Sequence, residues 1–395
     1  MIISQNDNLN INNKNTKIKS FLCVLAIIFL FFPSGIVSFF HSLDSYVRIF
    51  QILGFGFIIL FFLFSGRRII VNQCFIFSVL ILLIETLTTL YRGGSVLKAL
   101  FECFRFVGII WMITNEGRDP QSKIYGYLKT ICYIIGILSL LFSMFAGVSN
   151  TSLFGLEGEF PNFAIPILAI LFLDFQQKRR FEKIFFIVFS FLSFYCMIFV
   201  IDSSTAKVGS VFIVALVIFD RFAKKINPKV FLIIFAISFI AIVFFRITNY
   251  LGFFIEKVLN ESITLHKRTF AWDYSIELIK DSPIIGYGYI EKEFQYSIIY
   301  KYTNKWFAHP HDELLRLYLI GGLFNVLSII GLMISTAKVL SKNYQEKCVR
   351  IISYTLFTML IMSIVETCYN SYFYLLIAFA FNSDAIIKRY GYLLR

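Results

Sequence analysis

The sequence predicts an all-α, polytopic membrane protein with about twelve transmembrane helices. Of its 395 residues, 58% are hydrophobic and only 15% are charged, and the mean hydropathy is +0.76. Such a composition lies far outside the range of soluble domains. Apolar runs of roughly 17 to 25 residues, long enough to cross a bilayer of about 30 Å, begin near positions 19, 47, 69, 96, 126, 161, 183, 206, 229, 312, 349 and 371.

Basic residues are distributed unevenly between the connections of these spans. If both termini are cytoplasmic, the inside connections hold about 23 Lys and Arg and the short outside loops about four, as the positive-inside rule requires. The basic runs at 66–68, 176–180, 220–229 and 388–395 all fall inside. Membrane insertion and anionic lipid therefore explain the formal charge of +13, and no nucleic-acid partner is required.

The spans divide the chain into three parts. Residues 1–245 contain nine spans with short loops, residues 246–310 form one large outer loop, and residues 311–395 contain the last three spans. A connection as long as this loop is usually functional. Within it, 269–281 has helical character and is ended by Asp-Ser-Pro, after which Gly286 and Gly288 indicate a tight turn. We expect a short amphipathic helix on the outer membrane surface, covering a cavity.

The stretch AHPHDELLRLYLIGGL, residues 308–323, places two histidines and two carboxylates against an apolar run. One interpretation is a polar, Pro-started helix entry whose acids favour the N-terminal dipole. A second is a metal site, because imidazole and carboxylate are suitable ligands, although no familiar spacing is present. The residues of that second interpretation are His309, His311, Asp312 and Glu313, with His266 as a possible addition.

A third interpretation takes the same stretch as part of an active site. On a continuous helix, His311 and Gly322 are eleven positions apart and fall within about 20° of each other, with Leu315 and Tyr318 on the same stripe. The glycine pair Gly321 and Gly322 would let a neighbouring helix approach closely. This arrangement would fix the helix while leaving space above the glycines, next to the histidine.

His311, Leu315 and Gly322 meet the pattern H-x-x-x-L-x(6)-G. This pattern resembles the signature of the bacterial O-antigen ligase and polymerase superfamily, whose usual form is H-N-x-x-L-x(6)-G. Asp312 stands where the usual form has Asn, which puts a role of that amide in doubt.

Three further segments resemble elements of the same family, in the same order. Arg268, with Trp272 four residues later and a D-x-P-x-x-G-x-G ending, looks like the outer-loop segment. GLEGEFPNFA, residues 155–164, is similar to a Gly…Pro-Asn element that opens a span. SSTAKVGS, residues 203–210, is similar to a Ser-Arg-Gly element, with Lys207 at the arginine position. The resemblance covers residues 155–323 and implies a GT-C-like fold.

The resemblance implies transfer of a glycan from undecaprenyl pyrophosphate to a sugar hydroxyl at the outer face of the bacterial cytoplasmic membrane. A histidine with a pKa near 6.5 can take up a proton at neutral pH, so His311 is the candidate base. Arg268 can bind phosphate oxygens bidentately, and Lys207 can serve as a point charge. Because these cations supply the charge that a metal would otherwise supply, we expect no metal or other cofactor.

Arg316 lies one turn inside the predicted membrane helix, where a solitary arginine costs about 2.5–3.5 kcal/mol. It should therefore have an anionic partner, either lipid pyrophosphate or an acid such as Glu366 or Glu85. Glu102 and Arg105, three apart on one helix face, are expected to pair with each other. The predicted catalytic residues are thus His311 and Arg268, and the predicted substrate-binding residues are Lys207, Arg316, His309, Asn162, Glu366, Trp272 and Tyr318.

Other functions remain open at this point. Many permeases also have about twelve spans, but they keep their ionisable groups near the membrane midplane, whereas here these groups gather at outer ends of spans. Within the superfamily, Pro310 before the histidine and the Leu-Arg pair after it favour a polysaccharide polymerase of the Wzy type over a ligase that transfers the finished glycan to lipid A-core. The sequence leaves open whether a chain-length regulator also binds.

Overall fold

The structure is a computed structural model of the whole chain. It describes residues 18–29, 44–65, 70–119, 122–145, 151–152, 155–156, 159–250, 252–253, 268–289 and 310–390.

The described part of the chain is built almost entirely from helices, with one antiparallel pair of two-residue strands. A helix covers Ile18–Phe29, and the strands pair Thr151 with Leu156. The elements of the first half are α3 (Asp44–Ser65), α4 (Gln73–Tyr91), α5 (Val96–Glu116), α6 (Ile124–Phe145), β1 (Thr151–Ser152), β2 (Gly155–Leu156), α7 (Phe160–Phe172), η3 (Phe175–Gln177) and α8 (Arg180–Tyr195).

The second half contains the large outer segment and the last helices. The helix expected at 269–281 is present as α13. The elements are η4 (Cys196–Val200), α9 (Ser204–Ile218), α10 (Asp220–Ala223), α11 (Pro228–Phe239), η5 (Ile240–Phe244), η6 (Ile247–Asn249), α13 (Arg268–Asp281), α15 (Glu313–Lys342), α16 (Lys347–Met362), α17 (Ser371–Phe381) and α18 (Ser383–Tyr390).

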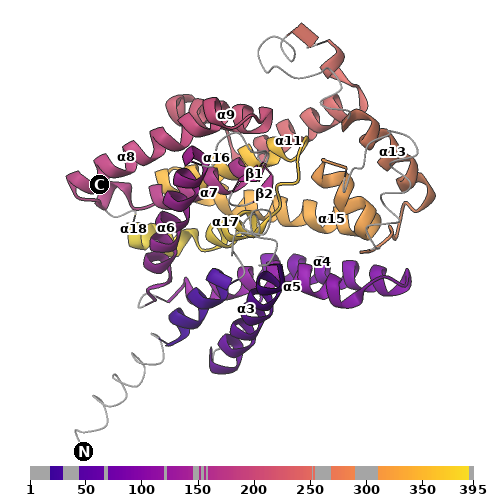
Figure 1. Cartoon of the computed structure of the whole chain (residues 1–395), viewed down its shortest axis with the longest axis horizontal. Coiled ribbons are helices and arrows are strands. Elements are labelled where there is room, and N and C mark those ends of the chain that lie inside the picture. The colour runs from indigo at the N-terminus through magenta and orange to yellow at the C-terminus, as the bar shows by residue number, and fades with distance from the viewer. Residues whose placement is uncertain are drawn as a thin grey trace, which may run out of the picture.

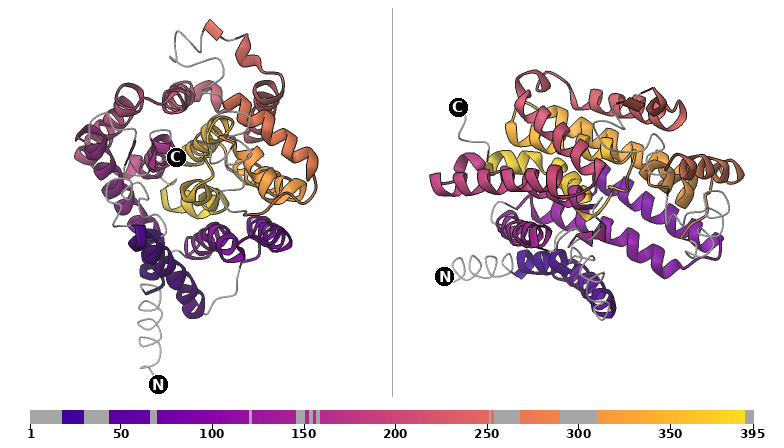
Figure 2. Two further views of the ribbon diagram at one scale, coloured as in Figure 1. Left: turned by 45° about the vertical axis from the view of Figure 1, so that its right-hand side comes forward. Right: turned by 45° about the horizontal axis from the view of Figure 1, so that its top comes forward.

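Helices α16 and α17 form the centre of the bundle, and the other helices surround them (Figures 1 and 2). Nearly every side chain of α17 is buried, including the aromatic residues Phe373, Tyr374 and Phe379. Helices α4 and α5 pack beside α15 and α17, and α7 and α9 pack beside α16. The far side of the bundle from α15 is closed by α6 and α8.

The outward faces of the helices are apolar. Phe181, Phe191 and Leu63 are each more than two-thirds exposed, which is typical of side chains that face lipid rather than water. Four helices in the described part are long and apolar enough to cross a membrane, and six further apolar helices are shorter. The chain is thus a helical membrane protein, and the number of about twelve spans stays a prediction.

Helix α15 is broken at Gly322, whose backbone has φ +65° and ψ −159°. The segment that follows α13, residues 283–288, fills this break. The N–H groups of Tyr287 and Gly288 donate to the carbonyls of Leu319 (2.7 Å) and Ile320 (2.8 Å). A broken helix leaves such carbonyls without intrahelical partners, so the inserted segment satisfies them.

The same segment is held on its other side by α4. Thr88 donates its hydroxyl to the Ile285 carbonyl (3.2 Å), and Arg92 donates its Nε–H to the Gly286 carbonyl (2.9 Å). Gly286 has a φ of +78°, and a side chain there would lie 2.8 Å from the Leu319 carbonyl oxygen. The turn predicted at Gly286 is therefore confirmed, and its close approach to α15 explains why a glycine is needed.

The continuous helix assumed from the sequence is wrong in two respects. His311 precedes the N-cap residue of α15, Asp312, and Gly322 interrupts the helix, so the helical phase that placed His311 above Gly322 does not apply. What approaches Gly322 closely is the backbone at Ile284 rather than a neighbouring helix. The physical reason is that Gly322 adopts a left-handed conformation, which L side chains rarely adopt.

Gly322→Ala is expected to destabilise the protein. A left-handed conformation costs a non-glycine residue about 1–2 kcal/mol, and the added Cβ would overlap the Ile284 carbonyl. The matched control is Gly126→Ala, because Gly126 lies in α6 with nothing within 4 Å of the added Cβ. Thermal unfolding in detergent should show a lower midpoint for Gly322→Ala only. Equal midpoints for the two variants would show that the break does not support the fold.

Candidate active site

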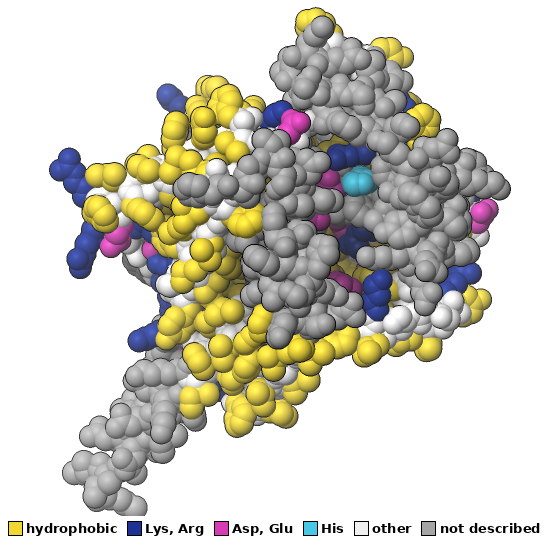
Figure 3. Space-filling view, in the orientation of Figure 1, with side chains coloured by type: hydrophobic (Ala, Val, Ile, Leu, Met, Phe, Trp, Pro, Cys, Tyr) yellow, Lys and Arg dark blue, Asp and Glu magenta, His cyan; other side chains and the backbone are white. Residues whose placement is uncertain are grey.

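His311 stands at the entry to α15 in a left-handed backbone conformation, with φ +54°. This conformation is uncommon for a residue with a side chain, and residues held in it often belong to functional sites. About a fifth of the imidazole is exposed. Of the four histidines in the chain, His311 alone lies in the described part. In Figure 3 the histidine side chain, drawn in cyan, is visible at the surface close to basic and acidic side chains.

Glu366 faces the imidazole from the connection between α16 and α17. Its Oε1 lies 3.3 Å from His311 Nδ1, and the same oxygen accepts the N–H of Thr367 at 3.1 Å. The side chain is only 8% exposed. A buried carboxylate needs hydrogen-bonding and charged partners, and these contacts supply them.

Arg268, the first residue of α13, binds the other side of the same carboxylate. Its NH2 lies 3.2 Å from Glu366 Oε2, and its NH1 donates to the Val365 carbonyl at 2.6 Å. About a fifth of its side chain is exposed. The structure therefore brings His311, Arg268 and Glu366 together from three separate parts of the chain.

Asn162, in the first turn of α7, holds the connection that carries Glu366. Its Nδ2 donates to the Thr367 carbonyl (3.0 Å), its Oδ1 accepts from the Cys368 thiol (3.1 Å), and its own carbonyl accepts from Asn370 Nδ2 (3.1 Å). Its side chain is buried. Asn162 thus supports the connection that carries Glu366, and its predicted substrate-binding role stays a prediction.

Glu159 is a part of the site that the sequence reasoning missed. It is the N-cap residue of α7, and burial, together with the negative charge of nearby Glu366, raises its pKa to about 7. Its carboxyl therefore titrates close to neutral pH. The sequence did contain a signal, which is the position of Glu159 three residues before Asn162 in the Pro-Asn element. An acid at this position has no oppositely charged residue nearby in the sequence with which to pair.

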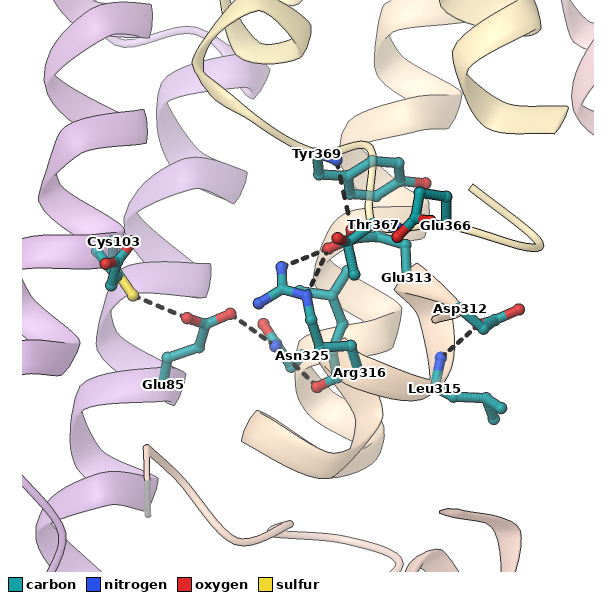
Figure 4. A network of polar contacts seen from close by, with 12 residues as sticks. Glu85, Cys103, Asp312, Glu313, Leu315, Arg316, Asn325, Glu366, Thr367 and Tyr369 are labelled. Atoms are coloured by element: carbon teal, nitrogen blue, oxygen red, sulfur yellow. Dashed lines mark hydrogen bonds and ion pairs between the residues drawn. The ribbon is translucent and has the colours of Figure 1, made fainter. Parts of the chain in front are cut away.

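Arg316 pairs with Glu313 on its own helix, and not with Glu366 as the sequence analysis allowed. Its Nε donates to Glu313 Oε1 at 2.9 Å, and the Glu313 carboxylate also accepts the N–H of Tyr369 at 3.4 Å (Figure 4). The i, i+3 spacing of Glu313 and Arg316 is a pairing that the sequence already contained. The expected pair of Glu102 and Arg105 is confirmed, at 3.0 Å.

Glu85 joins α4 to α5, α15 and the inserted segment through neutral donors. It accepts hydrogen bonds from Cys103 Sγ (2.8 Å), Asn325 Nδ2 (2.8 Å) and the Tyr289 hydroxyl (2.9 Å). Figure 4 shows the Glu85, Cys103 and Asn325 contacts beside Arg316. Glu85 is buried, so it fixes the helices rather than binding a ligand.

The remaining predicted residues are placed differently. Lys207 lies in the first turn of α9 and pairs with Asp202 at 3.3 Å. Trp272 is fully buried, with the Arg246 guanidinium 5.2 Å from its ring centre, so it packs α13 and does not face a substrate. Tyr318 is half-buried on α15. His309 lies outside the described residues.

The metal interpretation finds no support in the described part of the chain, where no three metal-ligating side chains converge. Asp312 caps α15 by accepting the Leu315 N–H at 2.8 Å, Glu313 pairs with Arg316, and His311 faces Glu366. These three consecutive side chains therefore point to different partners. His309 and His266, the other two histidines of that interpretation, lie outside the described residues.

Residues 188–330 match the family model described as O-Antigen ligase. This segment, which is less than half of the chain, is therefore similar to that family. This match confirms the resemblance to the O-antigen ligase and polymerase superfamily, whose members are glycan-processing enzymes. Searches of curated proteins and of solved structures find no match.

The matched segment contains His311, Arg268 and Lys207, but it ends before Glu366 and begins after Asn162. The structure thus completes the site with residues from outside the matched segment. The carboxylate that faces the histidine comes from the α16–α17 connection, and its support comes from α7.

Asp312 stands where the family pattern has Asn, and its environment explains why either residue serves. It caps α15 through Oδ1, which Asn does equally well. Burial raises the pKa of the Asp312 carboxyl well above its usual range, so the native state favours the neutral, protonated form, which resembles an amide. Because the unfolded carboxyl titrates near 3.9, this group lowers stability as pH rises above about that value.

Asp312→Asn should therefore retain the cap and remove the cost of burying an acid. At pH 7 its thermal midpoint is expected to equal or exceed that of the wild type. Asp312→Ala removes the cap and should lose about 0.5–2 kcal/mol. Unfolding midpoints of the two variants in the same detergent test this, and a loss for Asn as large as that for Ala would show that Asp312 acts as a charge.

Proposed function

We propose that this protein polymerises oligosaccharide repeat units, linked to undecaprenyl pyrophosphate, into O-antigen or capsular polysaccharide at the outer face of the bacterial cytoplasmic membrane. The observation that carries the proposal is the meeting of His311 and Arg268 at Glu366, within a glycan-processing family. A base and a phosphate-binding cation are the two groups that such a transfer needs.

In the proposed reaction, a hydroxyl oxygen of the acceptor sugar forms a bond to the anomeric carbon of the donor. The bond from that carbon to the phosphate oxygen breaks, and undecaprenyl pyrophosphate leaves with the electron pair. His311 takes up the hydroxyl proton. Arg268 binds the pyrophosphate oxygens as negative charge develops on the leaving group.

Charge along the bundle supports an outward-facing site. Basic residues gather at the end of the helices opposite His311. There Arg350 pairs with Asp220 at 2.8 Å, and Lys178 pairs with Asp174 at 2.8 Å. If this end is cytoplasmic, as the positive-inside rule favours, His311 and Arg268 face outward, as we propose.

The second candidate is a ligase, because the matching family model is described as O-Antigen ligase. A ligase would use the same base and cation to move a finished glycan onto lipid A-core. The two enzymes differ in the acceptor and share the chemistry at the anomeric carbon. Cells that lack the gene therefore separate them better than any single residue does.

Deletion of the gene is expected to leave one repeat unit per acceptor and to remove the long polysaccharide ladder on a gel. A polymerase joins lipid-linked repeats, so without it each exported unit stays single. A ligase moves finished chains, so without it long polymer accumulates on undecaprenyl pyrophosphate. Such accumulation would contradict the polymerase proposal and support the ligase.

Complementation of the deletion strain tests the role of the histidine. The wild-type chain should restore the ladder and His311→Ala should not, since loss of a general base lowers a rate by about 10² to 10⁴. His309→Ala is the matched control and should be much milder. Polymer at near-normal levels from His311→Ala, at equal expression, would remove His311 from the mechanism.

We also propose that the cations of the site replace a metal. Activity of the purified protein should then survive chelation by EDTA, and Arg268→Lys should be impaired as well as Arg268→Ala, because an ammonium lacks the planar fork of a guanidinium. Initial rates with a lipid-linked donor measure both effects. Loss of activity with EDTA and its return with Mn²⁺ or Zn²⁺ would restore the metal interpretation.

A further inference from the structure

Glu366 connects the two groups assigned to the chemistry. One oxygen lies 3.3 Å from His311 Nδ1 and the other 3.2 Å from Arg268 NH2. Because an ionised carboxylate only accepts hydrogen bonds, a neutral imidazole in this contact carries its proton on Nδ1. The lone pair of this neutral ring is then on Nε2, the nitrogen that would take up a substrate proton.

Contacts within the α16–α17 connection and with α7 hold Glu366 in place, and both of these segments lie outside the matched residues 188–330. The Thr367 N–H donates to Glu366 Oε1 at 3.1 Å, and buried Asn162 holds Thr367, Cys368 and Asn370. The start of α15 is also bound to this connection, because the Glu313 N–H donates to the Ser363 carbonyl at 3.0 Å. Residues beside the histidine and residues beside the carboxylate are thus held against each other.

We propose that Glu366 is a positioning residue that keeps the His311 imidazole protonated at Nδ1 and oriented toward the acceptor, and that Asn162 supports it in this role. The inference rests on the proposed function for its consequence in catalysis. The contact also has a consequence of its own. Removal of Glu366 takes away the acceptor that favours Nδ1–H, so the share of the Nε2–H tautomer of the neutral ring should rise.

Other charged groups face this pair and must be kept unchanged in the test. Arg268, on α13, carries a positive charge close to His311. Two acids, Asp312 and Glu313, follow His311 directly in the sequence. Glu159 lies near Glu366 at the start of α7. Substitution of Glu366 by Ala removes both acceptor oxygens, whereas Gln would keep one acceptor oxygen beside His311.

The first experiment observes the ring nitrogens of His311 without any substrate. Purified protein carrying His309→Ala and ¹⁵N-labelled histidine is examined by NMR, in which a protonated and an unprotonated ring nitrogen have different chemical shifts, and the His311 signals are those that His311→Ala removes. The neutral ring should carry its proton on Nδ1 when Glu366 is present, and Glu366→Ala should increase the share of the Nε2–H form, because it removes the acceptor. The matched control is Glu277→Gln, at an exposed acid of α13 that is paired with Lys280, and its spectrum should not change.

The second experiment uses initial rates of glycan transfer. Glu366→Ala should lower kcat, because the base is no longer held in one tautomer and orientation. Glu366→Asp keeps the charge and should recover part of kcat. Asn162→Ala should lower kcat by a smaller factor.

These outcomes separate the inference from the proposed function. An unchanged tautomer of His311 in Glu366→Ala overturns the inference, whatever the activity. A changed tautomer together with normal kcat also overturns it, because the contact would then exist without positioning the base. If the wild type transfers no glycan, the proposed function fails, and the changed tautomer still supports the pairing of Glu366 with His311.

Discussion

The insertion of residues 283–288 into the break of α15 at Gly322 is the constraint on which the active site depends. This segment is the continuation of α13, so its attachment to α15 and α4 also fixes the helix that begins with Arg268. The break is possible because Gly322 has no side chain, and it is stable because the inserted backbone satisfies the exposed carbonyls. A continuous α15 would leave the inserted segment no place to bind.

The site itself is a small set of opposite charges at one end of an apolar bundle. Glu366 is nearly buried and would be costly alone, but His311 and Arg268 approach it from two sides. The Thr367 N–H donates to the carboxylate, and Asn162 donates to the Thr367 carbonyl, so this support adds no charge. The arrangement leaves part of the imidazole and part of the guanidinium exposed, which are the groups that a base and a phosphate-binding residue must present.

Much of the fold could be predicted from hydropathy and from local signals. The apolar helices, the helix beginning at Arg268 and the turn glycines followed from composition and spacing, and the resemblance placed Arg268 and His311 in one site. The break at Gly322 could not be predicted, because the left-handed conformation depends on a segment far away in the sequence. Local pairs were also only partly recognised, since Glu102–Arg105 was expected and Glu313–Arg316 was not.

The proposed role of Glu366 could not be predicted from the sequence, for a similar reason. As an acid between two apolar helices, it could equally have served Arg316, and only the folded connection shows that it faces His311. Trp272 was misleading in the opposite sense. An aromatic residue four positions after Arg268 suggests a substrate surface, but the packing of α13 buries it beneath Arg246.

The most direct measurement is a reaction of the purified protein in lipid bilayers with a single lipid-linked repeat unit and no other acceptor. The proposed polymerase should produce lipid-linked chains of two or more repeats, and each new linkage should release one molecule of undecaprenyl pyrophosphate. A repeat unit that stays unreacted until lipid A-core is added, and is then transferred to it, would contradict the account.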